Sequence, residues 1–355
     1  MATCHRRPRL DILGGMAGAQ EILDLDDREV RVSNPDKVFF PAGGITKMAL
    51  IRYYLSVMPG VLVGCHMRPS TLYRWPNGVG APDDAFFQKR VPKHRPEWLE
   101  TETVTFPSGR SAEMLVMADA AHVVWALNTG AIDLNPWPVR RTDVDHPDEL
   151  RVDLDPTPGI PYSDVCAVAP VVRDVLDEHG LRGWPKTSGK RGMHIYVRIE
   201  PRWSFTEVRR AALALAREVE RRMPDVATTA WWKEERRGVF VDYNQNARDR
   251  TIASAYSVRP VADATVSCPL AWEELPVDPA ELTVATVPQR FAEGGDVGGG
   301  IDAHVGSLDA LHDLAYRDEH EGLGDAPWPP HFAKGAKEPK RVQPSRARHP
   351  AKDAE

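Results

Sequence analysis

The chain has 355 residues, of which 42% are hydrophobic and 27% charged, as in an ordinary globular protein with one large domain or two smaller ones. The formal net charge of −6 counts mildly against a nucleic-acid partner, although local basic clusters rather than net charge govern phosphate contacts. No apolar run approaches the roughly 20 residues that cross a bilayer, and the four cysteines are scattered. We therefore expect a cytoplasmic protein without a membrane span, a disulfide framework or a zinc knuckle.

Three parts are predicted along the chain. Residues 1–28 are typical of an N-terminal extension, residues 29–325 of one folded domain, and residues 326–355 of a basic, disordered tail with few apolar residues. A flexible loop is expected over the Gly-rich residues 292–300. Helix and strand signals alternate over residues 150–260, so the predicted class is α/β (α+β), with mixed β-sheets flanked by helices.

Four helices are predicted where apolar periodicity follows a capping residue or precedes a glycine. They cover residues 47–57 after Thr46, 120–129 after Asp119, 163–179 before Gly180, and 205–223 after the capping box of Ser204 and Glu207. The first of these helices is expected to stop before Pro59-Gly60, because proline lacks the backbone donor that a helix interior needs.

Residues 150–156 carry the most informative pattern. Apolar and charged residues alternate there, which is the period of a half-buried strand. Asp153 and Asp155 therefore project from the same face, roughly 7 Å apart along the strand, and Pro156 places them near its end. Two adjacent carboxylates suit a divalent cation such as Mg²⁺ or Mn²⁺. An isolated Asp-x-Asp is, however, more often a solvated strand end.

A basic, glycine-containing turn precedes a second alternating strand. It reads Ser188, Gly189, Lys190, Arg191, Gly192, Met193 and His194. The glycines allow a tight turn that brings backbone N–H groups close to an anion, and the hydroxyl and the two cations add to this. This chemistry suits a triphosphate, but the spacing is not that of a P-loop. An ordinary basic hairpin turn followed by a core histidine is the alternative.

Asp242 ends a third apolar strand, over residues 239–243. A buried strand acid is costly unless it is paired or binds a metal. It could form a structural salt bridge with Arg236, Arg237 or Arg248. Together with the Asp153/Asp155 pair, it could instead complete the three-carboxylate shell of a two-metal site for phosphoryl transfer.

Taken together, three motifs resemble the archaeo-eukaryotic primase superfamily. They are Arg-Val-Asp-Leu-Asp-Pro, Ser-Gly-Lys-Arg-Gly-Met-His-Ile-Tyr-Val, and Val-Phe-Val-Asp-Tyr-Asn-Gln-Asn-Ala-Arg-Asp-Arg-Thr-Ile-Ala, in that order. The chain is most similar to the polymerase domain of bacterial ligase D and its stand-alone actinobacterial relatives, over about residues 30–320. The resemblance implies a primase-polymerase fold with an RRM-like catalytic core within residues 29–325.

The resemblance also implies roles for individual residues. The catalytic, metal-binding residues would be Asp153, Asp155 and Asp242, which would hold two Mn²⁺ or Mg²⁺ ions. The nucleotide would be bound by Ser188, Gly189, Arg191, Gly192, His194, Gln245 and Arg259.

For DNA, the resemblance implies that Lys37 and Lys47 bind the 5′-phosphate at a gap or break, and that Phe86 and Phe87 stack on the template strand. Taken alone, the two lysines would be ordinary surface residues and the two phenylalanines could be core residues. Two positions depart from the family pattern: Asn135, where a histidine is common, and Ala255, where a proline is common.

The function implied is that of a template-directed nucleotidyltransferase, a DNA repair polymerase that fills short gaps and prefers ribonucleotides. The expected partners are gapped or broken DNA with a 5′-phosphate, NTP or dNTP, and a repair ligase or end-binding protein. The expected state is a monomer in the bacterial cytoplasm, associated with the nucleoid. Two alternatives remain open, a two-metal nuclease and a non-catalytic factor that binds DNA ends or gaps.

Overall fold

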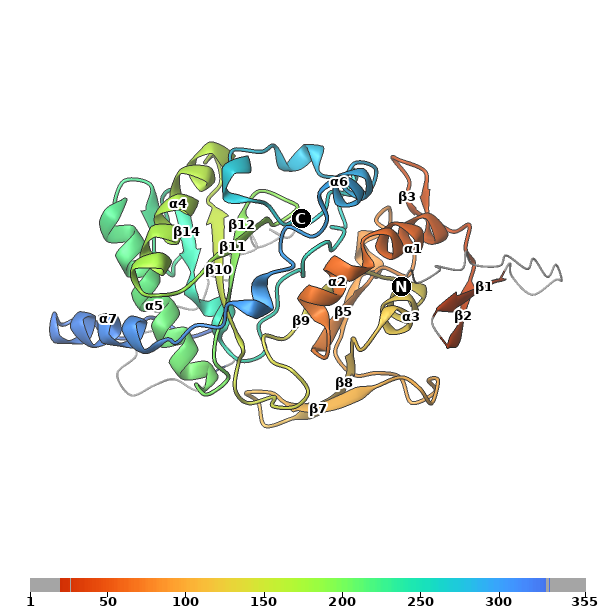
Figure 1. The fold of residues 1–355 in the computed structure, drawn as a ribbon, viewed down its shortest axis with the longest axis horizontal. Coiled ribbons are helices and arrows are strands. Elements are labelled where there is room, and N and C mark those ends of the chain that lie inside the picture. Colours follow the sequence, from red (N-terminus) through yellow and green to blue (C-terminus); the bar gives the residue numbers. More distant parts are fainter. Residues whose placement is uncertain (1–19, 26, 330–331, 333–355) are drawn as a thin grey trace, which may run out of the picture.

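The computed structural model describes residues 20–25, 27–329 and 332, which form two halves that lie side by side (Figure 1). The first half extends to about residue 140, and the second begins near residue 149. Helices flank several β-sheets, most of whose strand pairs are antiparallel, so the expected α/β class with mixed sheets is confirmed.

The first half is built on a five-stranded sheet in which β5 (Pro69–Arg74) pairs with three neighbours. The other strands are β6 (Phe86–Gln88), β7 (Thr101–Thr105), β8 (Ser111–Val116) and β9 (Ala131–Pro136). Three helices belong to this half: α1 (Lys47–Ser56), α2 (Met58–Cys65) and α3 (Ala120–Asn128). Their apolar side chains belong to the main core of the protein, which continues into the second half.

The predicted caps start two of these helices. The Thr46 hydroxyl accepts a hydrogen bond from the backbone N–H of Ala49, and the Asp119 carboxylate accepts one from that of His122. The expected stop before Pro59-Gly60 is confirmed, because α1 ends at Ser56 with Val57 as its C-cap. A second helix that was not expected, α2, begins at Met58 and holds the proline in its first turn, where no backbone donor is needed. Among the described residues no single helix is long and apolar enough to cross a membrane. Over the part of the chain that the structure describes, one pair of helices, α1 and α2, reaches that length and apolarity together, but the pair is bent by 82°.

Two small hairpins extend the first half. Strand β1 (Gln20–Leu25), which lies in the stretch expected to be an extension, pairs with β2 (Arg28–Ser33), and β3 (Val38–Phe40) pairs with β4 (Ile45–Thr46). The remaining residues of the expected extension, apart from 27 and 28, lie outside the described residues. So does the predicted basic tail, apart from residues 326–329 and 332.

The second half has the chain order β10–α4–β11–β12–α5–β14, and its sheet has the strand order β11-β12-β10-β14-β13. This is the βαββαβ arrangement of an RRM-like core, with β13 added at one edge. Its elements are β10 (Glu149–Pro156), α4 (Tyr162–Glu178), β11 (Trp184–Thr187), β12 (Met193–Arg198), α5 (Phe205–Arg222), β13 (Ala227–Thr228) and β14 (Val239–Asp242). The capping box predicted before α5 is present.

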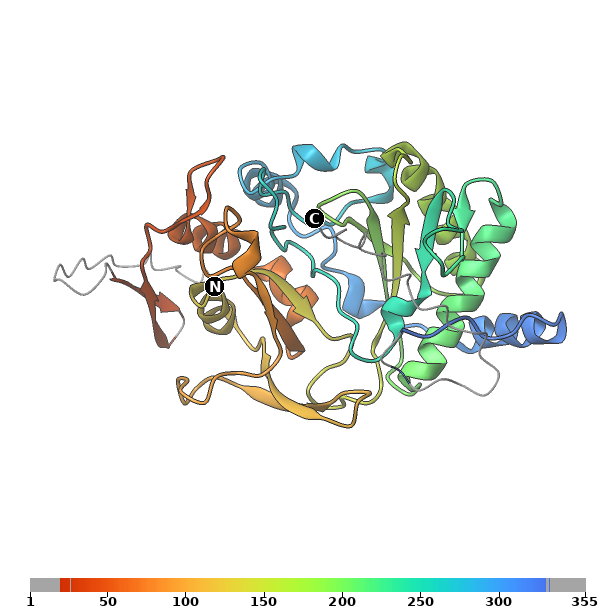
Figure 2. The ribbon, with the colours of Figure 1, turned by 180° about the vertical axis from the view of Figure 1, so that it is seen from behind.

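Helices α4 and α5 cover one face of this sheet, as both ribbon views show (Figures 1 and 2). Leu150, Val152 and Leu154 of β10 are buried, whereas Asp153 and Asp155 belong to the opposite face, which is turned toward the first half. The alternation predicted for residues 150–156 is therefore confirmed. It leaves the carboxylates on the face of the sheet that α4 and α5 do not cover.

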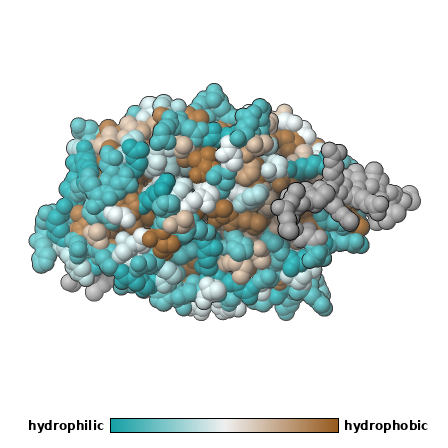
Figure 3. Space-filling view, in the orientation of Figure 1, coloured by the Kyte–Doolittle hydropathy of each residue, from teal (hydrophilic) through white to brown (hydrophobic). Residues whose placement is uncertain are grey.

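Two further helices follow the sheet, α6 (Val287–Gly294) and α7 (Asp309–His320). Helix α6 takes up the first three residues of the loop expected over 292–300, so the loop itself starts later. Helix α7 packs along α5 on the outside of the second half (Figure 1). On the face seen in Figure 3, hydrophilic residues prevail, and hydrophobic ones gather in patches toward the middle.

Candidate active site

Four polar side chains form a row across the uncovered face of the second sheet. Lys186 of β11 is the register partner of His194 on β12, His194 is the partner of Asp153 on β10, and Asp153 is the partner of Asp242 on β14. Direct cross-strand partners point to the same side of a sheet. Asp155 lies two residues further along β10 and shares that side, so the strand register brings all three predicted acids together.

The carboxylates of Asp153 and Asp242 face each other across the side chain of Gln245. The Gln245 amide donates hydrogen bonds to Asp153 Oδ2 at 3.1 Å and to Asp242 Oδ2 at 3.3 Å. Burial, together with the charges of Asp242 and Asp155, raises the pKa of Asp153 to about 8. Burial also raises the pKa of Asp242, against the opposing effect of a hydrogen bond from the Asn244 backbone.

This donor set suits hard divalent cations, because a bound positive charge would offset the burial and the mutual repulsion that raise the pKa values of these acids. Among the described residues, however, no three His, Cys, Asp or Glu side chains are already close enough to enclose a metal ion. The three acids therefore suit a divalent metal because they are carboxylates and because they lie on the same face of the sheet. Bringing them onto one ion requires side-chain rotation and displacement of the Gln245 amide.

The basic turn between β11 and β12 is organised by its serine. Ser188 Oγ accepts hydrogen bonds from the backbone N–H groups of Lys190 at 3.2 Å and of Gly192 at 3.0 Å. Gly189 has φ +68°, and a Cβ there would lie 2.4 Å from Arg259 Cγ. A Cβ on Gly192 would lie 2.3 Å from the Leu154 carbonyl oxygen. Both predicted glycines are therefore needed for close packing of the turn.

A cavity of about 620 Å³ opens between the two halves beside these groups. Its volume lies within the range of small-molecule sites. It is lined from the first half by Thr71, Tyr73, Phe87, Lys89, Asp133 and Asn135, and from the second half by Asp153, Lys190, His194, Gln245, Asp249, Arg250, Thr251, Ile252, Ala253 and Arg259.

Two predicted nucleotide contacts differ in their placement. Arg259 lines the cavity, but Arg191 does not: its guanidinium donates to the backbone oxygens of Thr157 at 3.2 Å and of Ile160 at 3.4 Å. Lys190, which the sequence offered only as a further charge in the turn, takes the cavity-facing place. Which of two adjacent cations faces the cavity depends on the turn conformation, and residue spacing alone does not reveal that.

Asp133 was missed by the sequence analysis. It is buried on β9, with its carboxylate 3.1 Å from Arg259 Nη1 and accepting a hydrogen bond from Asn135 at 3.0 Å. Burial raises the pKa of Asp133, and the charge of Arg259 opposes this. The available signal was the spacing of Asp133 and Asn135, two polar residues at i and i+2 in an apolar stretch. Asn135 thus supports Asp133 at the cavity wall.

The two aromatic residues predicted to contact DNA are exposed, not part of the core. The exposed fractions are 45% for Phe86 and 60% for Phe87. Phe87 stacks on the ring of Tyr73 with 4.1 Å between centroids, and the Arg74 guanidinium lies over the Phe86 ring. An exposed aromatic pair at the rim of the cavity can offer a face to a nucleic-acid base.

The two predicted phosphate-binding lysines differ in accessibility. Lys47 is buried, and its ammonium donates to Ser33 O at 2.6 Å and to the backbone and side-chain oxygens of Asn128 at 3.1 and 3.3 Å. Burial, with smaller contributions from the charges of Lys37 and Arg74, lowers the pKa of Lys47 to about 8. Lys37 is half-buried and donates to Asn77 Oδ1 at 2.8 Å. The more accessible cation at this place is therefore Lys37.

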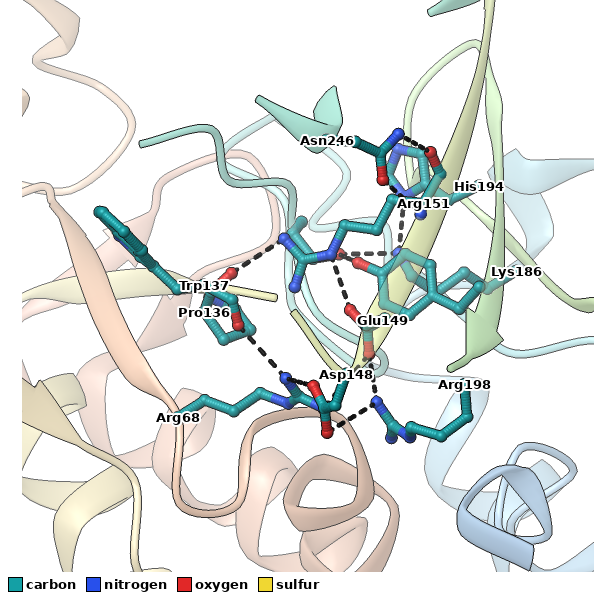
Figure 4. Close-up of polar contacts among 12 residues, drawn as sticks. Arg68, Pro136, Trp137, Asp148, Glu149, Arg151, Lys186, His194, Arg198 and Asn246 are labelled. Atoms are coloured by element: carbon teal, nitrogen blue, oxygen red, sulfur yellow. Dashed lines mark hydrogen bonds and ion pairs between the residues drawn. The ribbon is translucent and has the colours of Figure 1, made fainter. Parts of the chain in front are cut away.

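Behind the row lies a buried network of charged residues that connects the two halves (Figure 4). Arg68 of the first half binds both oxygens of Asp148, at 2.6 and 2.9 Å. Glu149 accepts from Arg151 at 2.7 Å and from Arg198 at 2.6 Å, and Arg151 also donates to the carbonyl of Pro136 on β9. The network fixes β10 against the first half directly next to the acids.

The sequence and the fold both match known proteins. The family model of the LigD primase-polymerase domain matches residues 46–297. The multifunctional non-homologous end joining protein LigD of Mycolicibacterium smegmatis is 33% identical over 287 residues, covering 79% of this chain and 37% of that protein. The corresponding DNA repair protein of Mycobacterium tuberculosis is 34% identical over 304 residues, covering 80% of this chain and 38% of that protein. The chain thus spans little more than a third of the length of these relatives.

Among solved structures, the polymerase domain of Mycobacterium tuberculosis ligase D in complex with DNA superposes with a TM-score of 0.72 at 34% sequence identity. The superposition covers 77% of this chain and 98% of that domain. Residues 46–297, which the family model matches, include Phe86 and Phe87 as well as the strands that carry the acids.

Proposed function

The chain belongs to the LigD primase-polymerase family, and from this membership we propose that it is a template-directed DNA repair polymerase that fills short gaps. The family is one of DNA-directed nucleotidyltransferases that use divalent metals. One observation supports the proposal most strongly. The strand register places Asp153 and Asp242 beside a cavity that is lined by several lysine and arginine side chains. A nuclease would use the same acids but would not need the cationic cavity.

In this proposal the primer 3′-hydroxyl attacks the α-phosphorus of an incoming nucleoside triphosphate. A bond forms between the 3′-oxygen and the α-phosphorus, the bond between that phosphorus and the bridging oxygen to the β-phosphate breaks, and pyrophosphate leaves. Asp153, Asp155 and Asp242 would hold two Mn²⁺ or Mg²⁺ ions, which supply positive charge to the attacking and leaving oxygens when bound.

The remaining roles belong to the cavity residues. Lys190 and Arg259 would neutralise the triphosphate, and His194 would donate to a phosphate oxygen. Ser188, Gly189 and Gly192 would hold the turn in the shape that brings Lys190 to the nucleotide, with the N–H groups of Lys190 and Gly192 bound to Ser188 Oγ. Gln245 would move from the acids when the ions enter. Arg191, which points toward residues 157–160, would support the turn and not the nucleotide.

DNA binding would use the first half. Phe87 would stack on a template base at the cavity rim, with Phe86 beside it, and Lys37 would bind the 5′-phosphate on the far side of the gap. Lys47 would hold the surrounding backbone in place. The substrates would be gapped or broken DNA and NTPs in preference to dNTPs, and a repair ligase or end-binding protein would be a partner. The names of the relatives favour a role in end joining.

Primer extension on a gapped duplex with a 5′-phosphate tests the proposal, with NTP compared with dNTP and Mg²⁺ with Mn²⁺. We expect addition that follows the template, and we expect Asp153→Asn and Asp242→Asn to abolish it while gapped-DNA affinity, measured by fluorescence anisotropy, stays within about threefold.

Three results would count against the polymerase. Strand shortening without nucleotides would favour the nuclease, and binding without extension by the wild-type protein would favour the non-catalytic factor. Full extension by the Asp153→Asn protein would remove the assigned metal site.

A further inference from the structure

The row of residues across the catalytic sheet ends in a buried lysine to which the proposed reaction gives no role. Lys186 is 2% exposed, on the edge strand β11, and its direct neighbour in the row is His194. No carboxylate lies within ion-pairing distance of its ammonium among the described residues. Burying a cation without a paired carboxylate costs free energy. The hydrogen bonds of the Lys186 ammonium should therefore indicate which role offsets this cost.

All three hydrogens of the Lys186 ammonium have acceptors. They point to His194 Nδ1 at 2.6 Å, to the carbonyl oxygen of Ala253 at 2.7 Å and to Ser267 Oγ at 2.6 Å (Figure 4 shows the first). Ser267 gives its own hydrogen to the carbonyl of Thr187 at 2.7 Å, so it can only accept from the lysine. An ammonium has three donors and no acceptor, and this one is therefore fully used inside the protein.

The contact with Lys186 determines what the other side of the imidazole can do. If Nδ1 accepts from the lysine, the ring proton is on Nε2, as an imidazole in its neutral form carries a single N–H. Nε2 lies 3.6 Å from Asp153 Oδ1, and His194 lines the cavity. The proton therefore lies on the side of the ring where Asp153 and the cavity for a bound nucleotide are found.

We propose that Lys186 is a positioning residue that fixes the ring of His194 so that its Nε2–H points at the triphosphate, an inference that rests on the proposed polymerase function. Lys186 does not touch substrate. Its effect on the reaction passes entirely through His194, in the way that a carboxylate or carbonyl beside a catalytic histidine selects the ring nitrogen that carries the proton. His194 is buried, with 5% of its surface exposed, so surrounding atoms limit rotation of the imidazole.

A double-mutant cycle tests this dependence. Lys186→Met keeps the length of the side chain and removes the donor, and we expect kcat/KM for the NTP to fall roughly 10- to 100-fold, as for loss of one hydrogen bond to a charged group. In a His194→Ala background the same change should have no further effect, because the residue through which it acts is gone. If the double variant lost kcat/KM by the product of the two single losses, the proposal would be overturned. An unchanged kcat/KM in Lys186→Met alone would also overturn it.

Arg198→Met is the matched control. Arg198 is also a buried cation of this sheet, but within the described residues the hydrogen bonds and ion pairs of its side chain are with Asp148, Glu149 and Asp302, and not with His194. Its effect on kcat/KM should therefore multiply with that of His194→Ala. If Lys186→Met does not fold, Ser267→Ala replaces it. This change frees one hydrogen of the ammonium, and any loss it causes should likewise vanish in the His194→Ala background.

A spectroscopic measurement tests the geometry without catalysis. In protein labelled with ¹⁵N-histidine, long-range ¹H–¹⁵N spectra should show His194 with the proton on Nε2, and Lys186→Met should shift the ring toward a mixture of both forms. A proton on Nδ1 in the wild-type protein would mean that Lys186 is a neutral amine that accepts a hydrogen bond from the ring, and the proposal would fail. Absence of extension by the wild-type enzyme would instead contradict the proposed function and leave this measurement to decide the inference on its own.

Discussion

At the scale of single residues, the chemistry of the site depends on how burial and neighbouring charges shift the pKa of each acid. Asp153 carries the largest consequence, because burial and the charges of Asp242 and Asp155 raise its pKa to about 8. A carboxyl group of an unfolded chain ionises near pH 4. The folded protein thus keeps a proton that the unfolded chain has released. In the proposed function, this proton would be exchanged for a metal ion.

We expect the stability of the metal-free protein to fall as pH rises from about 4 to about 8 through this residue. The sign follows because the folded state binds more protons than the unfolded state over this range. Mn²⁺ should raise the midpoint of thermal unfolding more at pH 8 than at pH 6. Thermal unfolding at both pH values, with and without Mn²⁺, measures this, and Asp153→Asn should flatten the dependence. An equal Mn²⁺ effect in Asp153→Asn would contradict the assignment.

The exposure of Phe87 leads to a second prediction. Because the ring is 60% exposed, Phe87→Ala should leave the unfolding midpoint nearly unchanged. It should weaken binding of a gapped duplex about 5- to 100-fold if one stacked base is lost. Fluorescence anisotropy measures this. Tyr316, an aromatic residue on α7 that is 53% exposed, is the control, and Tyr316→Ala should bind DNA like the wild type. Equal affinities in the two variants would remove Phe87 from the DNA site.

At the scale of elements, the turn that follows β14 is held from outside the sheet. This turn, residues Tyr243–Asn246, carries Gln245, and its Asn244 accepts from the buried Arg209 of α5 at 2.6 Å. Arg209 also donates to the carbonyls of Ala326 and Pro327, at 2.8 and 3.2 Å. The segment after α7 thus braces the turn next to Asp242, although it lies beyond residues 46–297, which the family model matches.

Asn244→Ala should therefore destabilise the protein by about 1–3 kcal/mol, because it leaves an N–H of the buried Arg209 without an acceptor. Urea unfolding measures the difference. Arg210→Ala is the control on the same helix: its ion pair with Glu319 is at the surface and is worth about 0–1 kcal/mol. A loss in Asn244→Ala no larger than that of the control would show that the brace contributes nothing.

At the scale of the whole molecule, the two halves are joined by buried charges as well as by the apolar core. Burial raises the pKa of Glu149, but Arg151, Arg68 and Arg198 outweigh this and bring it to about 2. A carboxylate with a lowered pKa contributes stability above its unfolded value near 4.3, and this stability is lost as pH falls toward 2. Since Arg68 comes from the first half and Glu149 from β10, acid should loosen the wall of the cavity together with the fold.

Arg68→Met should cost roughly 3–5 kcal/mol, because it leaves the buried Asp148 and Glu149 with one cation fewer. The midpoint of acid unfolding, followed by circular dichroism, should move to higher pH. Arg202→Met, which removes exposed pairs with Glu200 and Asp309, is the control and should leave that midpoint in place. An acid midpoint unchanged by Arg68→Met would mean that the apolar core alone joins the halves.

The sequence by itself determined the local features whose physical causes lie within a few residues. Alternation identified the face of β10 that carries the acids, capping residues located the helix starts, and glycine marked the tight turn of residues 188–192. The order of three motifs identified the family. These inferences succeeded because the strand period, the caps and the turn chemistry act over short distances along the chain.

Only the tertiary structure decided which side chains meet. The row from Lys186 to Asp242 depends on the register of four strands, Lys47 is buried by the backbone of Asn128, and Lys190 faces the cavity in place of Arg191. Asp133 belongs to the site because its carboxylate forms an ion pair with Arg259, which is distant in the sequence. Such contacts are set by packing between distant segments, and residue type and spacing do not encode them locally.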